Sequence, residues 1–297
     1  MIKYYFYKIG QALAGIFSLK IAYRIAVFLS DFKYMVSPRD RRAAQENFRI
    51  ICGEGVDVRP IAKKMFRNFG KYLVEFFCMP KFNEEFIRQY VDVENQHRLD
   101  DALKRGKGVI IMTAHIGNWE LGGLALGRLG YPLTAIALPH REKSVNELFN
   151  KQRAAGGVTV VPVNMAIRRC IRILKENGII ALLADRDFSA TGKPVSFFGR
   201  ETMMPYGPAM FAYRTGATVL PMFLRRKDNE HFRIVIEEPL ELLEKGQGVR
   251  EEDFLVQFMR QQAAVLEKAI QEDPTQWMMF RRFWIDRESG PERITST

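Results

Sequence analysis

The sequence predicts an α/β fold, in which helices flank a mostly parallel central sheet and an amphipathic helical cap precedes the sheet at the N-terminus. Two observations support this fold class. Short runs of apolar, largely β-branched residues recur from about residue 100 onward, and segments long enough for helices separate them. The runs are apolar on both faces, which is typical of parallel strands that helices cover on two sides.

The expected elements follow one another along the chain. Strands are predicted at 108–114, 133–138, 158–163, 179–184, 217–224 and 232–237. Helices are predicted between and after them, at 118–129, 142–156, 166–177, 206–216 and 250–272. Residues 36–90 are also predicted to be helical, because apolar side chains such as Ile61, Met65 and Phe69 recur there at helical spacing.

The first 35 residues are basic, aromatic and apolar. Five Lys and Arg residues stand there against one acid, Asp31, which gives a net charge of +4. A membrane-spanning helix needs roughly 20 consecutive apolar residues, and Lys20 and Arg24 interrupt this segment. We therefore expect an amphipathic helix that lies in the bilayer interface, with its Lys and Arg side chains reaching toward water. A helix packed into the core and a short spanning anchor are the alternatives.

Composition restricts the class of partner. The net charge of +11 and a pI near 9.6 favour polyanions: nucleic acid, anionic lipid head groups or an acidic protein. The sequence contains no motif typical of a helix-turn-helix, an RNP fold or a zinc finger, so nucleic-acid binding is disfavoured. A mean hydropathy of −0.16 argues against a polytopic membrane protein. The three cysteines are widely spaced and odd in number, which favours a reducing compartment over a disulfide framework.

The strongest candidate for chemistry is the segment HIGNWE at 115–120, directly after a predicted strand. Ligands of open α/β sheets bind at the carboxyl ends of the strands. Glu120 is expected in the first turn of the next helix, where it would fix the tautomer of His115 and leave the other ring nitrogen as a general base. A loop histidine next to an ordinary first-turn glutamate is the alternative. The sequence lacks GxSxG, GxxxxGK[ST], GxGxxG and HExxH motifs, which weakens the case for nucleotide, dinucleotide and zinc chemistry.

HIGNWE resembles the HxxxxE motif of the lipid A late acyltransferases, which are similar to the wider HxxxxD glycerolipid acyltransferases. Further segments resemble that family in the same order along the chain: KQRAAGG around Arg153, LLADRD at 182–187, the stretch from VSFFG to VLPMF at 195–223, and PTQWMMFRRF at 274–283. The similarity covers about residues 20–285. Family members often have Gln where this chain has Arg186.

The resemblance implies a fold like that of the glycerolipid acyltransferases and an enzyme that moves a fatty acyl chain from acyl carrier protein to a hydroxyl of a Kdo-lipid A precursor, in lipopolysaccharide biosynthesis. In this role His115 is the general base and Glu120 orients it. The backbone N–H groups of Gly117 and Asn118 are the expected donors to the oxyanion. An acyltransferase of the same fold that acts on another membrane lipid, a phosphoinositide mannoside or a glycerophospholipid, is the alternative.

Arg153 and Asp185 are the second tier of expected substrate-binding residues. Arg153 would bind a substrate phosphate through two N–H groups, or it is an exposed charge on its helix. Asp185 follows the apolar run IIALLA and so lies at a strand end, where it belongs either to the cleft or to a cap. Arg186 would contact phosphate or remain solvated. Arg281 and Arg282, in the aromatic C-terminal segment, would meet anionic lipid or belong to a docked segment.

The expected organisation is one structural domain with two regions: residues 1–90, which are helical and associate with the membrane, and residues 91–297, which form the α/β acyltransferase region. The expected partners are acyl carrier protein, an anionic glycolipid and the membrane surface, with no nucleic acid. No metal or redox cofactor is implied. The expected location is the cytoplasmic face of the inner membrane, peripheral or anchored by the N-terminus.

Overall fold

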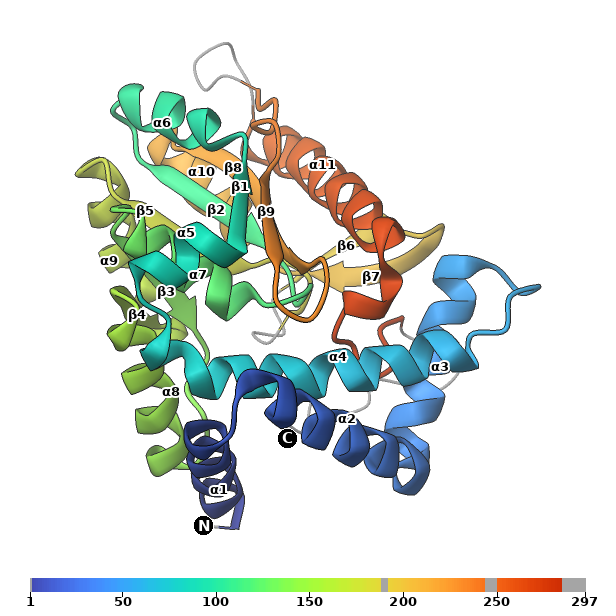
Figure 1. Cartoon of the computed structure of the whole chain (residues 1–297). Coiled ribbons are helices and arrows are strands. Elements are labelled where there is room, and N and C mark those ends of the chain that lie inside the picture. Colours follow the sequence, from blue (N-terminus) through green and yellow to red (C-terminus); the bar gives the residue numbers. More distant parts are fainter. Residues whose placement is uncertain (1, 188–191, 244–249, 285–297) are drawn as a thin grey trace.

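The computed structural model describes residues 2–187, 192–243 and 250–284, and a seven-stranded sheet forms the centre of this part of the chain (Figure 1). The strand order is β1-β9-β8-β2-β5-β3-β4, and β6 and β7 form a separate two-stranded sheet. The strands are β1 (Val91–Glu94), β2 (Val109–Thr113), β3 (Leu133–Ala137), β4 (Val158–Pro162), β5 (Ile179–Leu183), β6 (Lys193–Phe197), β7 (Arg200–Met204), β8 (Thr218–Arg226) and β9 (Phe232–Ile236).

The sheet is mostly parallel, which confirms the predicted fold class. β2 pairs in parallel with β5 and β8, and β3 pairs in parallel with β4 and β5. β9 runs antiparallel to β8, and β1 pairs in parallel with β9. Five parallel strands therefore end at the same edge of the sheet, and this edge carries the site described below.

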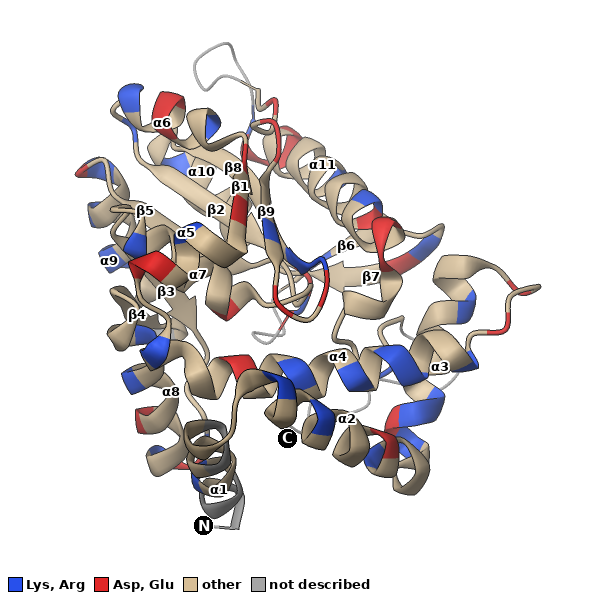
Figure 2. Cartoon of the chain, in the orientation of Figure 1, with Lys and Arg blue, Asp and Glu red and all other residues tan. Residues whose placement is uncertain are grey.

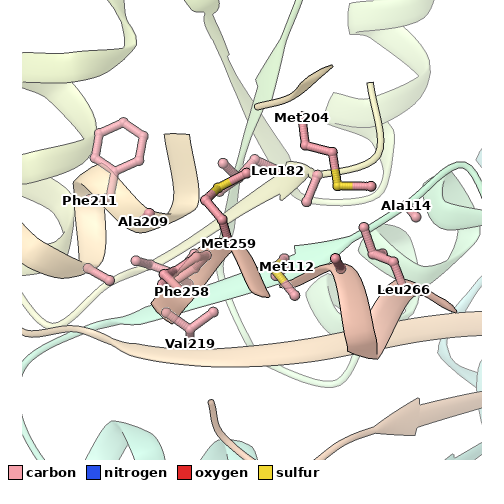
Figure 3. Packing of buried hydrophobic residues seen from close by; sticks show 14 of the residues in the cluster. Met112, Ala114, Leu182, Met204, Ala209, Phe211, Val219, Phe258, Met259 and Leu266 are labelled. Carbon is pink, nitrogen blue, oxygen red and sulfur yellow. The ribbon is translucent and has the colours of Figure 1, made fainter. Parts of the chain in front are cut away.

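Helices cover both faces of the sheet. One face packs against α5 (Glu84–Tyr90), α6 (Gln96–Lys104), α7 (Trp119–Arg128) and α8 (Lys143–Ala155), and the other against α9 (Ala166–Lys175), α10 (Gly207–Thr215) and α11 (Glu251–Glu272). The alternation of side chains along β2 divides its residues between the two cores. Val109 and Ile111 pack with the α7 side, whereas Ile110 and Met112 pack with the α11 side, where Met112 lies near Phe258 (Figure 3).

Four further helices precede α5 in the chain: α1 (Ile2–Ile16), α2 (Leu19–Val36), α3 (Pro38–Cys52) and α4 (Arg59–Cys78). Short 3-10 helices lie at η1 (Met79–Lys81), η2 (Val163–Met165) and η3 (Pro274–Gln276). In Figure 1, α4 runs along the lower end of the sheet, and its Tyr72 ring stacks on Trp119 at the start of α7, 4.5 Å between centroids. In the described part of the chain, no helix has both the length and the apolar character needed to cross a bilayer.

The predicted elements agree closely with the observed ones. The six predicted strands correspond to β2, β3, β4, β5, β8 and β9, and each boundary differs by two residues at most. The predicted helices at 118–129, 142–156, 166–177, 206–216 and 250–272 correspond to α7 to α11 with the same tolerance. The sequence analysis missed β1, α6 and the β6–β7 hairpin. β1 is a four-residue edge strand, VDVE, whose apolar pattern is too short to identify it.

Candidate active site

His115 and Asp185 form a hydrogen-bonded pair at the carboxyl ends of two adjacent strands. Thr113 at the end of β2 is in register with Leu183 at the end of β5, so the residues two positions further on face each other. The Nδ1 atom of His115 lies 2.8 Å from Oδ1 of Asp185. The backbone N–H of His115 and the indole N–H of Trp277 both donate to Oδ2, at 3.2 and 3.1 Å. Asp185 is fully buried, and these contacts use both of its oxygens.

This pairing fixes the state of the imidazole. An ionised carboxylate only accepts hydrogen bonds, so Nδ1 of His115 carries the proton and Nε2 keeps its lone pair. Burial lowers the pKa of His115 below its ordinary value of 6.5, and the charge of Arg186 adds to this effect, while Asp185 opposes it. Burial alone would raise the pKa of Asp185, but His115, Arg186 and Trp277 together hold it well below its usual range. At neutral pH the pair is therefore a neutral imidazole next to an anionic carboxylate, which is the state of a general base.

Glu120 does not make the contact predicted for it. Its two carboxylate oxygens accept from Arg153 of α8, from Nε at 2.9 Å and from one terminal nitrogen at 2.5 Å, and both side chains are largely buried. The prediction that Glu120 fixes the tautomer of His115 was wrong, because Asp185 makes that bond. The first turn of α7 directs Glu120 toward α8, whereas the parallel register brings Asp185 to the ring from a position 70 residues away. Participation of Glu120 in catalysis stays a prediction.

The predicted oxyanion donors are already hydrogen-bonded. The N–H of Gly117 donates to the carbonyl of Gln276 at 2.9 Å, and the N–H of Asn118 donates to the carbonyl of Leu224 at 3.2 Å. The assignment of these two N–H groups to the oxyanion was therefore wrong in this structure. Sequence reasoning placed them at a helix start, where N–H groups are usually free, but β8 and the C-terminal segment pack against this loop.

Gly117 and Asn118 instead shape the turn from β2 into α7. Gly117 has φ +59°, and a Cβ atom there would lie 1.9 Å from the Leu224 carbonyl oxygen, so the close approach of β8 requires glycine. Asn118 is the N-cap of α7, because its Oδ1 accepts from the N–H of Leu121 at 2.9 Å. Among the described residues, no hydrogen bond from the N–H of Trp119 or Glu120 is found, so these two first-turn groups are candidate donors.

The C-terminal segment is docked at the site. Trp277 is fully buried, and Met278 donates its N–H to the carbonyl of His115 at 2.8 Å. Arg282 pairs with Glu46 of α3, 2.6 Å between the closest atoms. The alternative of a docked segment is therefore the one observed. The resemblance of the QW segment to the family drew attention to Trp277, but the contact of Trp277 with Asp185 could not be predicted from the sequence.

Arg186 lies beside the pair rather than in solvent. One of its terminal N–H groups donates to the carbonyl of Met278, and its Nε is buried with no hydrogen-bond partner among the described residues. Burial lowers the pKa of Arg186 to about 10, and it remains a cation at neutral pH. A contact between Arg186 and a substrate phosphate stays a prediction.

The chain is similar in sequence to a known family and to several known proteins. The chain matches the sequence model of the family described as bacterial lipid A biosynthesis acyltransferase over residues 1–285. It is 32% identical over 168 residues to a phosphatidylinositol mannoside acyltransferase of Mycobacterium tuberculosis, a match that covers 54% of this chain and 53% of that protein. A protein of the same name from Mycolicibacterium smegmatis is 32% identical over 159 residues, 52% of each chain. The chain thus spans about half the length of the mycobacterial relatives it matches.

A second relative extends the match. The lipid A biosynthesis palmitoleoyltransferase of Escherichia coli is 25% identical over 232 residues, which cover 77% of this chain and 72% of that protein. One group of relatives is therefore more similar over a shorter segment, and the other is less similar over a longer one.

Proposed function

The chain belongs to the bacterial lipid A biosynthesis acyltransferase family, as its motifs predicted, and from this premise we propose that it transfers a fatty acyl group from a thioester to a hydroxyl of an anionic membrane glycolipid. The observation that carries the proposal is the His115–Asp185 pair. It supplies a neutral imidazole at the carboxyl edge of a parallel sheet, where ligands of such folds bind.

The proposed reaction uses His115 twice. Its Nε2 removes the proton of the acceptor hydroxyl while the oxygen forms a bond to the thioester carbonyl carbon. Asp185 stabilises the imidazolium that results. When the tetrahedral intermediate collapses, the C–S bond breaks and the imidazolium returns the proton to the leaving thiolate. The first-turn N–H groups of Trp119 and Glu120 are the proposed donors to the oxyanion, in place of Gly117 and Asn118.

The proposed acceptor is a Kdo-lipid A precursor, and the proposed donor is acyl-acyl carrier protein. The family description and the relative from E. coli support this acceptor. A second acceptor, a phosphatidylinositol mannoside, is supported by the 32% identity to the mycobacterial relatives. Both are anionic lipids with free sugar hydroxyls, and Arg153 is the proposed contact for a phosphate group of either one. Its remaining terminal nitrogen, which does not bond Glu120, would make that contact.

The outer face of α2 supports association with the membrane surface. Phe28, Phe32 and Met35 are 72%, 59% and 71% exposed, and they lie on the face opposite Tyr23 and Ala26, which are buried. Lys and Arg residues accompany them on α2, α3 and α4 (Figure 2). An exposed apolar helix face with flanking basic residues matches an anionic bilayer interface. The proposed location is the cytoplasmic face of the inner membrane. Flotation with anionic vesicles tests the association of α2 with a membrane surface. Equal flotation of wild type and Phe28→Ser/Phe32→Ser would count against this association.

Acyl transfer in detergent tests the reaction directly. The purified chain is mixed with thioesters of acyl carrier protein and of coenzyme A, and with either a Kdo-bearing tetra-acylated lipid A precursor or a phosphatidylinositol mannoside. Mass spectrometry then measures the gain of one acyl chain, with His115→Ala as the control. Gain on the lipid A precursor supports the first acceptor. Gain on the mannoside alone supports the second, and no gain on either lipid with any donor would refute the proposed function.

A further inference from the structure

The carboxylate of Glu75 is buried next to residues 115–118, the turn between β2 and α7 that is called the catalytic loop below. Glu75 of α4 is fully buried, and groups from three other elements converge on it. The hydroxyl of Tyr23 on α2 donates to Oε1 at 2.6 Å, the side-chain N–H of Asn118 donates to Oε2 at 2.7 Å, and the guanidinium of Arg226 at the end of β8 forms an ion pair with Oε1. The contacts span the N-terminal helices, the sheet and the N-cap of α7.

Within this cluster, the buried charges and polar groups compensate one another. A buried charge is strongly unfavourable unless a counter-charge and hydrogen bonds compensate it. Arg226 is 10% exposed at the side chain, and its other terminal nitrogen donates to the hydroxyl oxygen of Tyr23 at 3.1 Å. Burial and the neighbouring carboxylate raise the pKa of Tyr23, so its hydroxyl stays a donor. The three donors use both oxygens of the Glu75 carboxylate.

The cluster reaches the catalytic loop by two routes. Asn118 uses its N–H₂ group for Glu75 while its Oδ1 caps α7, so Glu75 fixes which way the cap is turned. The backbone N–H of Arg226 donates to Oε1 of Gln276 at 2.8 Å, and the side-chain N–H of Gln276 donates to the carbonyl of Arg226 at 3.1 Å. The carbonyl of Gln276 in turn holds the N–H of Gly117. Both routes end within three residues of His115.

We propose that Glu75 is a positioning residue, which holds the turn between His115 and α7 in its reactive shape from a helix outside the α/β region. This inference rests on the proposed function for its kinetic consequence. It goes beyond that function because no hydrogen bond or ion pair of Glu75 with His115 or Asp185 is found among the described residues, and none of the family-like segments contains Glu75. Tyr23 brings α2 into the same network, so the helix with the exposed apolar face is joined to the catalytic loop through Glu75, by one hydrogen bond on each side of its carboxylate.

Two variants separate positioning from folding. Glu75→Gln keeps the volume but leaves the charge of Arg226 unpaired, so it can unfold the chain. Asn118→Ser keeps a good N-cap and the Glu75–Arg226 pair, and removes only the direct hydrogen bond between Glu75 and the loop. The matched control is Asp31→Asn. Asp31 binds Arg67 at 2.7 and 2.6 Å and so joins α2 to α4, as Tyr23 and Glu75 do, but neither residue contacts the catalytic loop.

Kinetics and hydrogen exchange are measured on the full chain. We expect Asn118→Ser to lower kcat by about 10²-fold with KM for both substrates within twofold, because the loss of alignment affects the reacting geometry. A folded Glu75→Gln should lower kcat at least as much, and the double variant should lose no more than Glu75→Gln alone, since Asn118 reaches Glu75 only through the hydrogen bond that Glu75→Gln also changes. Asp31→Asn should keep wild-type kcat. Amide exchange of residues 115–121 should be faster than in wild type in Asn118→Ser and unchanged in Asp31→Asn.

The outcomes are separable. If wild type transfers no acyl chain, the proposed function fails, and exchange of residues 115–121 still decides whether Glu75 positions the loop. Unchanged exchange and unchanged kcat in Asn118→Ser would overturn the inference. An equal loss of kcat in Asp31→Asn would overturn it too, because the effect would then come from general loosening of α2 against α4.

Discussion

Two buried carboxylates, Glu120 within the HIGNWE segment and Asp185 beside it, have different surroundings and therefore different tasks. Asp185 reaches His115 from the end of a neighbouring strand, whereas Glu120 lies on the same segment as His115 and binds Arg153 of α8. Burial alone would lower the pKa of the Arg153 guanidinium, but Glu120 raises it above its ordinary value, so Glu120 keeps a permanent counter-charge. The partner of Asp185 is neutral at rest and gains a charge only during reaction. The proximity of a carboxylate in sequence therefore says less about its task than the charge state of its partner.

This difference predicts opposite responses to mutation. Removing the partner of a permanent buried charge mainly lowers stability, because the remaining ion is left uncompensated. Removing the partner of a neutral base mainly lowers activity, because the carboxylate is needed most when the imidazolium forms. The predictions below test that division, from the largest expected effect to the smallest.

His115→Ala should give the largest loss of activity. We expect kcat to fall by roughly 10²–10⁴-fold, since general-base catalysis contributes about this much. Acyl transfer to the acceptor lipid, followed by mass spectrometry, measures it, and thermal unfolding checks that the fold is intact. Turnover within tenfold of wild type would remove His115 from the mechanism.

Asp185→Asn should follow closely, with kcat lower by at least about 10²-fold, because an amide in place of the carboxylate permits the wrong imidazole tautomer and cannot stabilise the imidazolium. The same kinetic assay measures this loss. If Asp185 acts in catalysis and Glu120 in stability, Asp185→Asn must lose more kcat than Glu120→Gln when both proteins are folded. The reverse order would restore Glu120 as the partner of His115.

Glu120→Gln should act mainly on stability. It leaves the guanidinium of Arg153, 14% exposed, without its counter-charge, and we expect the free energy of unfolding to fall by about 3–5 kcal/mol. Urea denaturation measures this change. The double variant Glu120→Gln/Arg153→Met should regain most of the loss, because it removes the unpaired charge as well. A fully stable Glu120→Gln with a severe loss of kcat would show that Glu120 acts in catalysis.

The smallest expected effect is on pH dependence. A general base works when neutral, so kcat/KM should rise with pH through the pKa of His115, and burial together with Arg186 places that limb below pH 6.5. Arg186→Gln removes a nearby positive charge and should move the limb to higher pH. Asp185→Asn removes a negative charge and should move the residual activity to lower pH. Shifts of the same sign in both variants would contradict this electrostatic account.

The fold was predictable because its signals are local. Each parallel strand is a short apolar run between helices, and strand boundaries were predicted to within two residues. His115 was found for the same reason: a histidine directly after such a run lies at the ligand-binding edge. The cap at Asn118 and the glycine before it also follow from the rules of a strand-to-helix turn. The hairpin of β6 and β7 was missed, although these strands are five residues each, because only two positions of each strand are buried, too few to form a recognisable apolar run.

The partners of these residues were not predictable, since a sequence does not state which groups from distant positions arrive at the same place. The order of strands in the sheet puts β5 beside β2, and this brings Asp185 to His115. The packing of β8 and of the C-terminal segment uses up the N–H groups of Gly117 and Asn118. The sequence by itself determined the fold class and the family, and it singled out His115 as the candidate base, because periodicity and motifs are local properties. The tertiary structure decided which carboxylate the base uses and which amides stay free, because hydrogen bonds form between whatever groups the register and the packing bring within 3 Å or so.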